Sequence, residues 1–409
     1  MKNPGVLLLA AASSLMAQPA ALTLAQAVDS ALKNYPSIRV SQEQINAAAA
    51  GIQLARTAYL PRIDALAQAN RATRNNVFGL LLPQSVIPSM SGPVIGSNNL
   101  GSAWGSAIGT LVTWEPFDFG LRAGNVSLAT AARAQSEAAL QRTRYEVTVA
   151  TVDAYLTMAA AQETVRAAQA GVERAEIVAR TIDALVNAQL RPGADASRAQ
   201  AELAAARTEL IQAQQAVDVA RATIAQFVGG DPARIAISAP ALLQLPPERT
   251  AEPLNVAANP IAIEQNAVVA QAEAQLHVLE RSYFPRFYLQ GSAYARGTSA
   301  ETNGNLLGGL NGLAPSVQDY ALGFTVMFPL SELPSLRARE SAQASTIRAQ
   351  TARAEQIAAD LRARWNVAAA TVQGGRAPDR RQYADSGGSG AHGRAASHRT
   401  LSVRSRKHR

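Results

Sequence analysis

"YLPRIDALAQ" (residues 59–68) and "YFPRFYLQGS" (residues 283–292) follow one pattern, in which an aromatic residue, an apolar residue, Pro and Arg precede an alternating segment. Upstream the match continues at equal spacing, because Pro36 precedes Pro61 as Pro260 precedes Pro285. The runs between are rich in Ala, Gln and Glu. Internal repeats set the frame for reading the rest of a sequence. We interpret the chain as a tandem duplication and call the shift that carries Tyr59 to Tyr283 the repeat offset.

Each repeat is expected to begin with helix. Thr23 can act as the N-cap of a short helix over residues 23–34. A second helix is predicted from Pro36 to Tyr59, because Pro suits the first turn of a helix and Pro61 stops it by removing a backbone donor. The second repeat has the same helix from Pro260.

Alternating segments then predict four strands, at 62–74, 103–115, 286–297 and 318–329. The clearest is "DYALGFTVMF", whose apolar face carries Tyr320, Leu322, Phe324, Val326 and Phe328. Strands of about ten residues with aromatic residues on an apolar face are typical of outer-membrane barrels. The alternative is an ordinary β-sandwich, in which one face of each strand packs in a core between two sheets. Only four strands are predicted and helices surround them, so no second sheet is available to form that core.

A long helical hairpin is predicted over residues 121–228. Its first helix, 121–189, would measure about 100 Å at 1.5 Å per residue. "RPGADAS" (191–197) interrupts it, and Asp195 or Ser197 can cap the returning helix. That helix has a coiled-coil seam spaced by three and four, which comprises Leu203, Ala206, Leu210, Ala213, Val217, Ala220, Ile224 and Phe227.

Pro and Gly return in a linker over residues 229–259, and the second repeat then spans residues 260–373. Its last helix is predicted to run from near Pro334 to Gln373. Beyond Gln373 the helical period is lost. We expect residues 374–409 to be disordered and interpret them as an out-of-frame tail, because their composition cannot bury enough apolar surface to order the chain.

Composition argues against catalysis. The chain has no Cys and four His, three of them in the last eighteen positions. No nucleophile–base pair, metal cluster or phosphate-binding loop is found. We predict no catalytic residue, no metal and no cofactor, and therefore a protein that is not an enzyme.

The net charge of +8 does not indicate a nucleic-acid partner. From Gly374 onward, eight Arg and one Lys stand against two Asp, a net charge of +7, so the rest of the chain carries +1. The basic segment also lacks the interleaved aromatic residues of a base-stacking surface.

The first residues, "MKNPGVLLLAAASSLMAQPA" (1–20), have the layout of a secretory signal peptide cleaved near Ala17 or Ala20. A short buried helix is the alternative. No Cys follows the segment, which excludes a lipoprotein anchor, so we expect an exported protein.

Four membrane strands cannot close a barrel by themselves. Open sheet edges in lipid leave backbone groups unpaired, so only closed barrels span membranes, and the smallest have about eight strands. The predicted fold class is therefore mostly α with membrane β, in which each chain contributes four strands to a shared barrel and the long helices extend from it.

The repeated order of elements, the helix-ending "YLPR" and "YFPR", the exits "WEPFDFG" and "FPLSELPS" and the tip "QLRPGADASRAQAEL" resemble the TolC-type outer-membrane efflux proteins. The resemblance covers residues 22–373. It implies a homotrimer with a twelve-stranded barrel in the lipid of the outer membrane of a Gram-negative-type cell and a periplasmic α-barrel. A periplasmic adaptor and an inner-membrane pump would be its partners. The region that carries acidic gate residues in the family has no counterpart here.

The resemblance also implies two functional surfaces. The hairpin tip would meet the adaptor, through Leu190, Arg191, Pro192, Gly193, Asp195, Ser197 and Arg198. A plain turn with solvated Arg side chains is the alternative. The aromatic residues of the strands would face the membrane, at Trp104, Trp114, Tyr320, Phe324 and Phe328.

Three functions stay open on the sequence. The first is a channel that passively conducts exported solutes, such as drugs, toxic compounds or secreted substrates. The second is an exported coiled-coil structural protein that does not conduct, although such a scaffold has no use for the apolar strand face. The third is a non-functional truncated channel product.

Overall fold

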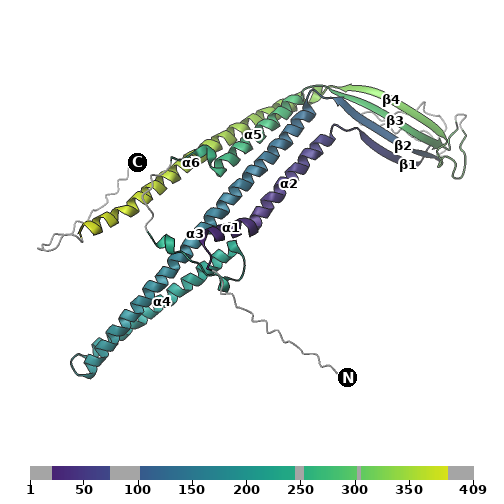
Figure 1. Ribbon diagram of the computed structural model, residues 1–409. Coiled ribbons are helices and arrows are strands. Elements are labelled where there is room, and N and C mark those ends of the chain that lie inside the picture. The colour runs from purple at the N-terminus through teal and green to yellow at the C-terminus, as the bar shows by residue number, and fades with distance from the viewer. Residues whose placement is uncertain (1–20, 74–101, 245–252, 302–304, 386–409) are drawn as a thin grey trace, which may run out of the picture.

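The computed structural model describes residues 21–73, 102–244, 253–301 and 305–385. A four-stranded sheet forms one end of the molecule, and long helices lead away from it (Figure 1). The predicted fold class is confirmed, since most described residues are helical and the strands are antiparallel.

The two repeats share one order of elements. In the first, the helices and strands are α1 (Leu24–Asn34), α2 (Pro36–Thr57), β1 (Arg62–Thr73), β2 (Ser102–Phe117), α3 (Leu121–Asn187) and α4 (Gly193–Val228). In the second they are α5 (Pro260–Arg281), β3 (Arg286–Thr298), β4 (Val317–Met327) and α6 (Leu333–Asp385). Short 3-10 helices lie at Pro232–Arg234, Pro240–Leu243, Val256–Ala258 and Leu330–Glu332.

Local sequence accounts for the helix starts. Thr23 caps α1 in a capping box with Gln26, in which each side chain bonds the other residue's backbone N–H. Pro36 and Pro260 occupy the first positions of α2 and α5, where the missing N–H has no partner to lose. The Asn259 side chain accepts the N–H of Ile261 at the start of α5.

The strands follow each other in the order β1-β2-β3-β4, each antiparallel to the next. Arg62 stands opposite Thr113 in the first pair, and Arg286 stands opposite Met327 in the last. β2 and β3 join the two repeats, with Thr113 opposite Gln290, and the register shifts between Trp114 and Phe117. The strands β1 and β4 form the two edges of the sheet.

The hairpin of α3 and α4 packs along the seam that the sequence predicts. Leu203, Ala213, Val217, Ala220 and Ile224 are buried on α4. Small side chains at this spacing allow the two helix backbones to approach closely. The 67 residues of α3 span about 100 Å at 1.5 Å per residue.

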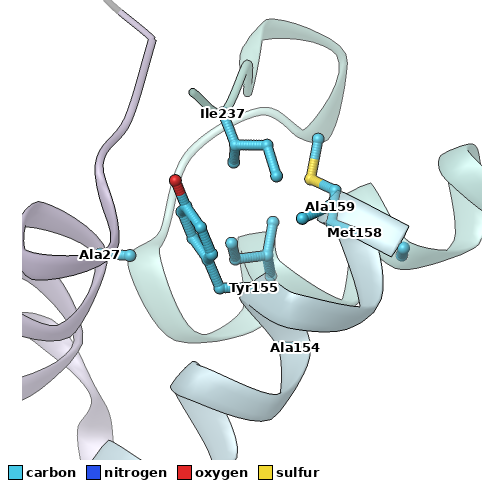
Figure 2. Close-up of a cluster of buried hydrophobic side chains, with 8 residues drawn as sticks. Ala27, Ala154, Tyr155, Met158, Ala159 and Ile237 are labelled. Carbon is cyan, nitrogen blue, oxygen red and sulfur yellow. The ribbon is translucent and has the colours of Figure 1, made fainter. Parts of the chain in front are cut away.

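A buried cluster around Tyr155 ties three distant segments to the middle of α3. Figure 2 shows the Tyr155 ring beside Ala27 of α1 and Ile237 of the linker. The Tyr155 hydroxyl lies 3.0 Å from the carbonyl oxygen of Leu22 and 2.8 Å from that of Ser238. Burial raises the pKa of this hydroxyl, so it stays protonated and donates to these carbonyls.

The predicted end of the last helix is wrong. α6 does not stop at Gln373 but continues to Asp385. Starting a helix is the costly step, whereas each further residue adds a hydrogen bond. Two successive glycines, each about 1 kcal/mol less favourable than Ala in a helix, therefore do not end a helix that is already formed. Residues 386–409 of the expected tail and the expected signal peptide, 1–20, lie outside the described residues.

Candidate functional site

The sheet has two chemically different faces. Residues opposite each other on paired strands share a face, and successive residues alternate between faces. The register therefore assigns every strand position to one of the two faces. One face, called here the polar face, carries Arg62, Asp64, Gln68, Thr113, Gln290, Ser292, Tyr294, Arg296, Asp319 and Thr325.

The opposite face, called here the apolar face, carries Ile63, Ala65, Ala67, Ala69, Ile108, Val112, Trp114, Phe287, Leu289, Tyr320, Leu322, Phe324 and Val326. Many of these side chains are exposed, and Tyr320 and Leu322 reach 88% and 77% exposure. Scattered apolar side chains are common on protein surfaces, but a contiguous band marks a membrane or interaction surface.

Ion pairs organise the polar face. Arg296 of β3 pairs with Asp319 of β4 at 2.9 Å, and Arg62 pairs with Asp64 at 2.9 Å.

A close approach of β2 and β3 requires glycine on the same face. Gly109 stands opposite Tyr294, and a Cβ at Gly109 would clash with the Tyr294 Cβ. Only glycine allows the two backbones to approach this closely.

A buried ion pair forms the first junction, defined as residues 58–61 and 117–122, where the sheet meets α2 and α3. The Arg122 Nε lies 2.9 Å from Asp118 Oδ2, and each side chain is 8% exposed. The Arg122 N–H and the Gly120 N–H donate to the Asp118 carboxylate. Burial disfavours the charged carboxylate, but these bonds from Arg122 and Gly120 outweigh it and hold the pKa of Asp118 below its usual range.

The same Arg122 fastens the end of α2. Its Nη1 donates to the Ala58 carbonyl at 3.5 Å, and its guanidinium lies 4.7 Å from the centroid of the Tyr59 ring. The Trp114 indole N–H donates to the Tyr59 carbonyl at 3.1 Å. The first junction therefore locks the short helix, the strand exit and the long helix together.

Phe119 connects the two repeats at the first junction. Its backbone lies in the left-handed region, with φ of 49°, and the next residue, Gly120, has φ of 91°. This turn places the Phe119 ring in a stack with Phe284 of the second repeat, with centroids 5.1 Å apart. Non-glycine residues rarely adopt positive φ, and the aromatic contacts hold this one.

The second junction, defined as residues 282–285 and 328–340, uses different chemistry. The Tyr283 hydroxyl donates to Glu340 Oε2 at 2.7 Å. The bond to Glu340, with partial burial and the charge of that carboxylate, raises the pKa of Tyr283. Tyr59 and Tyr283 are counterparts in the two repeats, since both precede the shared Pro-Arg pair by two positions.

The hairpin tip is exposed and held by local contacts. α4 begins at Gly193 after the extended residue Pro192. The expectation that Asp195 or Ser197 caps this helix is wrong, because both lie inside it, in or next to its first turn. Asp195 instead pairs with Arg191 at 3.4 Å, and Arg198 pairs with Glu202 at 3.4 Å.

The structure keeps the two predicted surfaces apart. The tip residues lie at the far end of α3 and α4 from the sheet that bears the aromatic residues (Figure 1). Of those aromatic residues, Tyr320, Phe324 and Phe328 are well exposed, Trp114 is less so, and Trp104 is half-buried under the Arg71 guanidinium.

Sequence reasoning missed Asp118, Arg122 and Tyr155. The sequence did contain a signal for the first two, because Asp118 precedes Arg122 by four residues at a strand exit. Opposite charges at this i, i+4 spacing can form an ion pair.

The family described as "Outer membrane efflux protein" matches residues 27–230, from α1 through the hairpin. The chain belongs to the outer membrane efflux protein family. This efflux protein therefore lies in the outer membrane, with its helical part in the periplasm. No curated protein matches the sequence.

Solved structures show the same fold. The CmeC outer membrane channel of Campylobacter jejuni is 16% identical with a TM-score of 0.64, over 81% of this chain and 67% of CmeC. The open MtrE outer membrane channel of Neisseria gonorrhoeae is 19% identical with a TM-score of 0.61, over 82% and 70%. VceC, an outer membrane protein of Vibrio cholerae, is 18% identical with a TM-score of 0.58, over 82% and 75%.

Among the described residues no three His, Asp or Glu side chains are grouped to hold a metal ion. None of the described helices has a stretch apolar and long enough to cross a membrane.

Proposed function

We propose that this efflux protein is a passive outer-membrane conduit built from three copies. The two-faced sheet with two open edges carries the proposal. Each copy would give four strands to a twelve-stranded barrel, with the apolar face against lipid and the polar face lining the channel. The long helices would continue the conduit through the periplasm.

The apolar face explains why lipid is its proposed neighbour. Side chains such as Tyr320, Leu322 and Phe324 are exposed in a single copy. Open edges in lipid leave backbone groups unpaired at several kcal/mol each, so the edges must close with other copies. Trp104, Trp114, Tyr320, Phe324 and Phe328 are the proposed lipid-contacting aromatic residues.

Assembly and conduction are tested together. The protein should fractionate with outer membranes as a detergent-stable trimer and raise the conductance of planar lipid bilayers. A soluble periplasmic monomer would overturn the channel proposal. A membrane trimer without conductance would favour a scaffold or a non-functional product.

The conduit would accept solutes from an inner-membrane pump through a periplasmic adaptor, and the hairpin tip is its proposed adaptor contact. Arg191 and Arg198 are 52% and 83% exposed, which leaves them accessible to a partner. Asp195, Leu190, Pro192, Gly193 and Ser197 complete this surface.

Charge reversal tests the adaptor contact. Arg191→Glu with Arg198→Glu should weaken adaptor crosslinking and efflux at unchanged trimer yield, because exposed substitutions change stability by about 0.5 kcal/mol or less. Arg166→Glu is the matched control, since this exposed Arg also pairs with a nearby Glu but lies away from the tip. Efflux equal to that of the control would leave the tip as a plain turn.

A further inference from the structure

We propose that β4 of one copy pairs with β1 of the neighbouring copy in a defined register, in which Met327 stands opposite Leu66. The inference rests on the proposed barrel and specifies its interface. The duplication supplies the argument, because the join between repeats inside one copy is the counterpart of the join between copies.

Counterpart positions follow from the two hairpins of the sheet. Arg62 and Arg286 are equivalent by the repeat offset, since each follows the shared Pro. Arg62 stands opposite Thr113, and Arg286 stands opposite Met327. Met327 therefore takes in the second repeat the place that Thr113 takes in the first.

The internal join then gives the register between copies. Thr113 of β2 stands opposite Gln290 of β3. Gln290 is the counterpart of Leu66 by the same repeat offset. Met327 of one copy should therefore stand opposite Leu66 of the next copy, and two residues along, Thr325 should stand opposite Gln68.

The side chains at the two edges complement each other in this register. On the polar face, Leu66 and Met327 are apolar exceptions, 38% and 53% exposed in the single copy, and they would cover each other. Thr325 and Gln68, both polar, would also meet.

On the apolar face, large residues of one edge would meet small residues of the other. Phe324, Val326 and Phe328 would stand opposite Ala69, Ala67 and Ala65 of the neighbouring copy. The three large side chains are exposed in the single copy. Large residues against small ones across a pair bury apolar area without a clash.

The hydrogen-bond pattern identifies the positions that a disulfide can probe. The Ser299 N–H donates to the Trp104 carbonyl at 2.8 Å, and the Trp104 N–H donates to Ser299 Oγ at 2.7 Å. Both backbone groups of Trp104 therefore bond toward the β3 side, as in a hydrogen-bonded pair. Hydrogen-bonded and non-hydrogen-bonded pairs alternate, and the latter have Cα atoms about 4.5 Å apart. Polar-face pairs such as Thr113 with Gln290 are therefore non-hydrogen-bonded. The proposed pair of Thr325 with Gln68 is also a non-hydrogen-bonded pair.

Cysteine scanning tests the register directly, because the native chain has no Cys. Gln68→Cys would be combined in turn with Ala321→Cys, Gly323→Cys, Thr325→Cys or Met327→Cys, all on the polar face of β4. Disulfides need Cα atoms within about 7 Å. After oxidation of outer-membrane fractions, the Thr325 combination should give the fastest conversion to covalent trimer, by at least tenfold over Ala321, and each single Cys variant should give none.

The outcomes separate the register from the channel proposal. A detergent-stable trimer that crosslinks fastest through Ala321, Gly323 or Met327 overturns the register and leaves the conduit intact. A trimer in which none of the four combinations crosslinks also overturns it, because then β1 and β4 do not meet. Absence of any trimer, with or without Cys, overturns the proposed function and the register with it.

Discussion

The two junctions between sheet and helices fasten equivalent tyrosines by different means. At the first junction the Tyr59 ring lies under the Arg122 guanidinium, whose charge is balanced by the buried Asp118. At the second, the Tyr283 hydroxyl donates to Glu340. In both, the tyrosine that follows the end of the short helix is tied to the first turns of the long helix. The repeats keep a shared geometry while the interactions that maintain it differ.

The difference concerns charge burial. The first junction encloses an ion pair, whereas the second joins one hydroxyl to one carboxylate without a buried cation. Breaking a buried pair leaves an uncompensated charge, which is strongly destabilising. The first junction should therefore be the more sensitive of the two to substitution.

Asp118→Asn should have the largest effect. It leaves the Arg122 charge buried without a counter-ion, which should lower the free energy of unfolding by about 3–5 kcal/mol. Denaturant unfolding in detergent, followed by circular dichroism, measures this loss. Asp118→Asn combined with Arg122→Met should recover most of it, because the buried charge is gone. A loss below about 1 kcal/mol in the single variant would show that the pair is not buried in the assembled protein.

Acid should weaken the first junction selectively. The pKa of Asp118 is lowered in the folded state, so the stability it contributes is complete above the ordinary pKa of Asp, about 3.9, and is lost as pH falls through the folded pKa. Thermal unfolding between pH 7 and pH 2 should therefore show a steeper decline below about pH 4 in the native protein than in Asp118→Asn. Parallel curves would contradict a lowered pKa at this carboxyl.

Tyr59→Leu should have a moderate effect. It removes the ring face from Arg122, an interaction of about 0.5–2 kcal/mol, whereas Tyr59→Phe keeps that face and should unfold like the native protein. The same denaturant series measures both. If Phe and Leu were equally destabilising, the hydroxyl and not the ring would be the important group, as at the second junction.

Tyr283→Phe should have the smallest effect, a small loss of stability at neutral pH that disappears in the alkaline range. The pKa of Tyr283 is raised, so its contribution is complete below the ordinary pKa of Tyr, about 10, and is lost as pH rises through the folded pKa. The native protein should lose more thermal stability than Tyr283→Phe between pH 9 and pH 12. Identical alkaline curves would mean that the bond to Glu340 contributes nothing.

Local patterns were sufficient to predict the order of elements. Pro36, Pro61 and their counterparts mark helix ends by removing backbone donors, and alternation marks the strands. The α4 seam also follows from spacing alone, since its residues lie on one helix face. These features depend on neighbours within a few residues.

The missed features depend on residues brought together by the fold. Arg122 reaches Ala58 and Tyr155 reaches Leu22 from distant parts of the sequence, and no local period encodes such contacts. The end of α6 does not follow from the apolar pattern for another reason, because the helix continues to Asp385 after that pattern is lost. For the tip, Pro192 starts α4 earlier than the side chains of Asp195 and Ser197 suggested.

The attachment of Leu22 beside Tyr155 has a consequence for the sequence of folding events. The backbone of Leu22 bonds to Ala236 and Ser238, which follow it only after the entire α3–α4 hairpin. A chain synthesised from its N-terminus therefore carries this segment unpaired until the whole first hairpin has emerged. Closing so long a loop is slow compared with forming helices. Packing of the Leu22 segment against Tyr155 in the middle of α3 is thus a late step in folding. It is completed only after both helices of the hairpin exist.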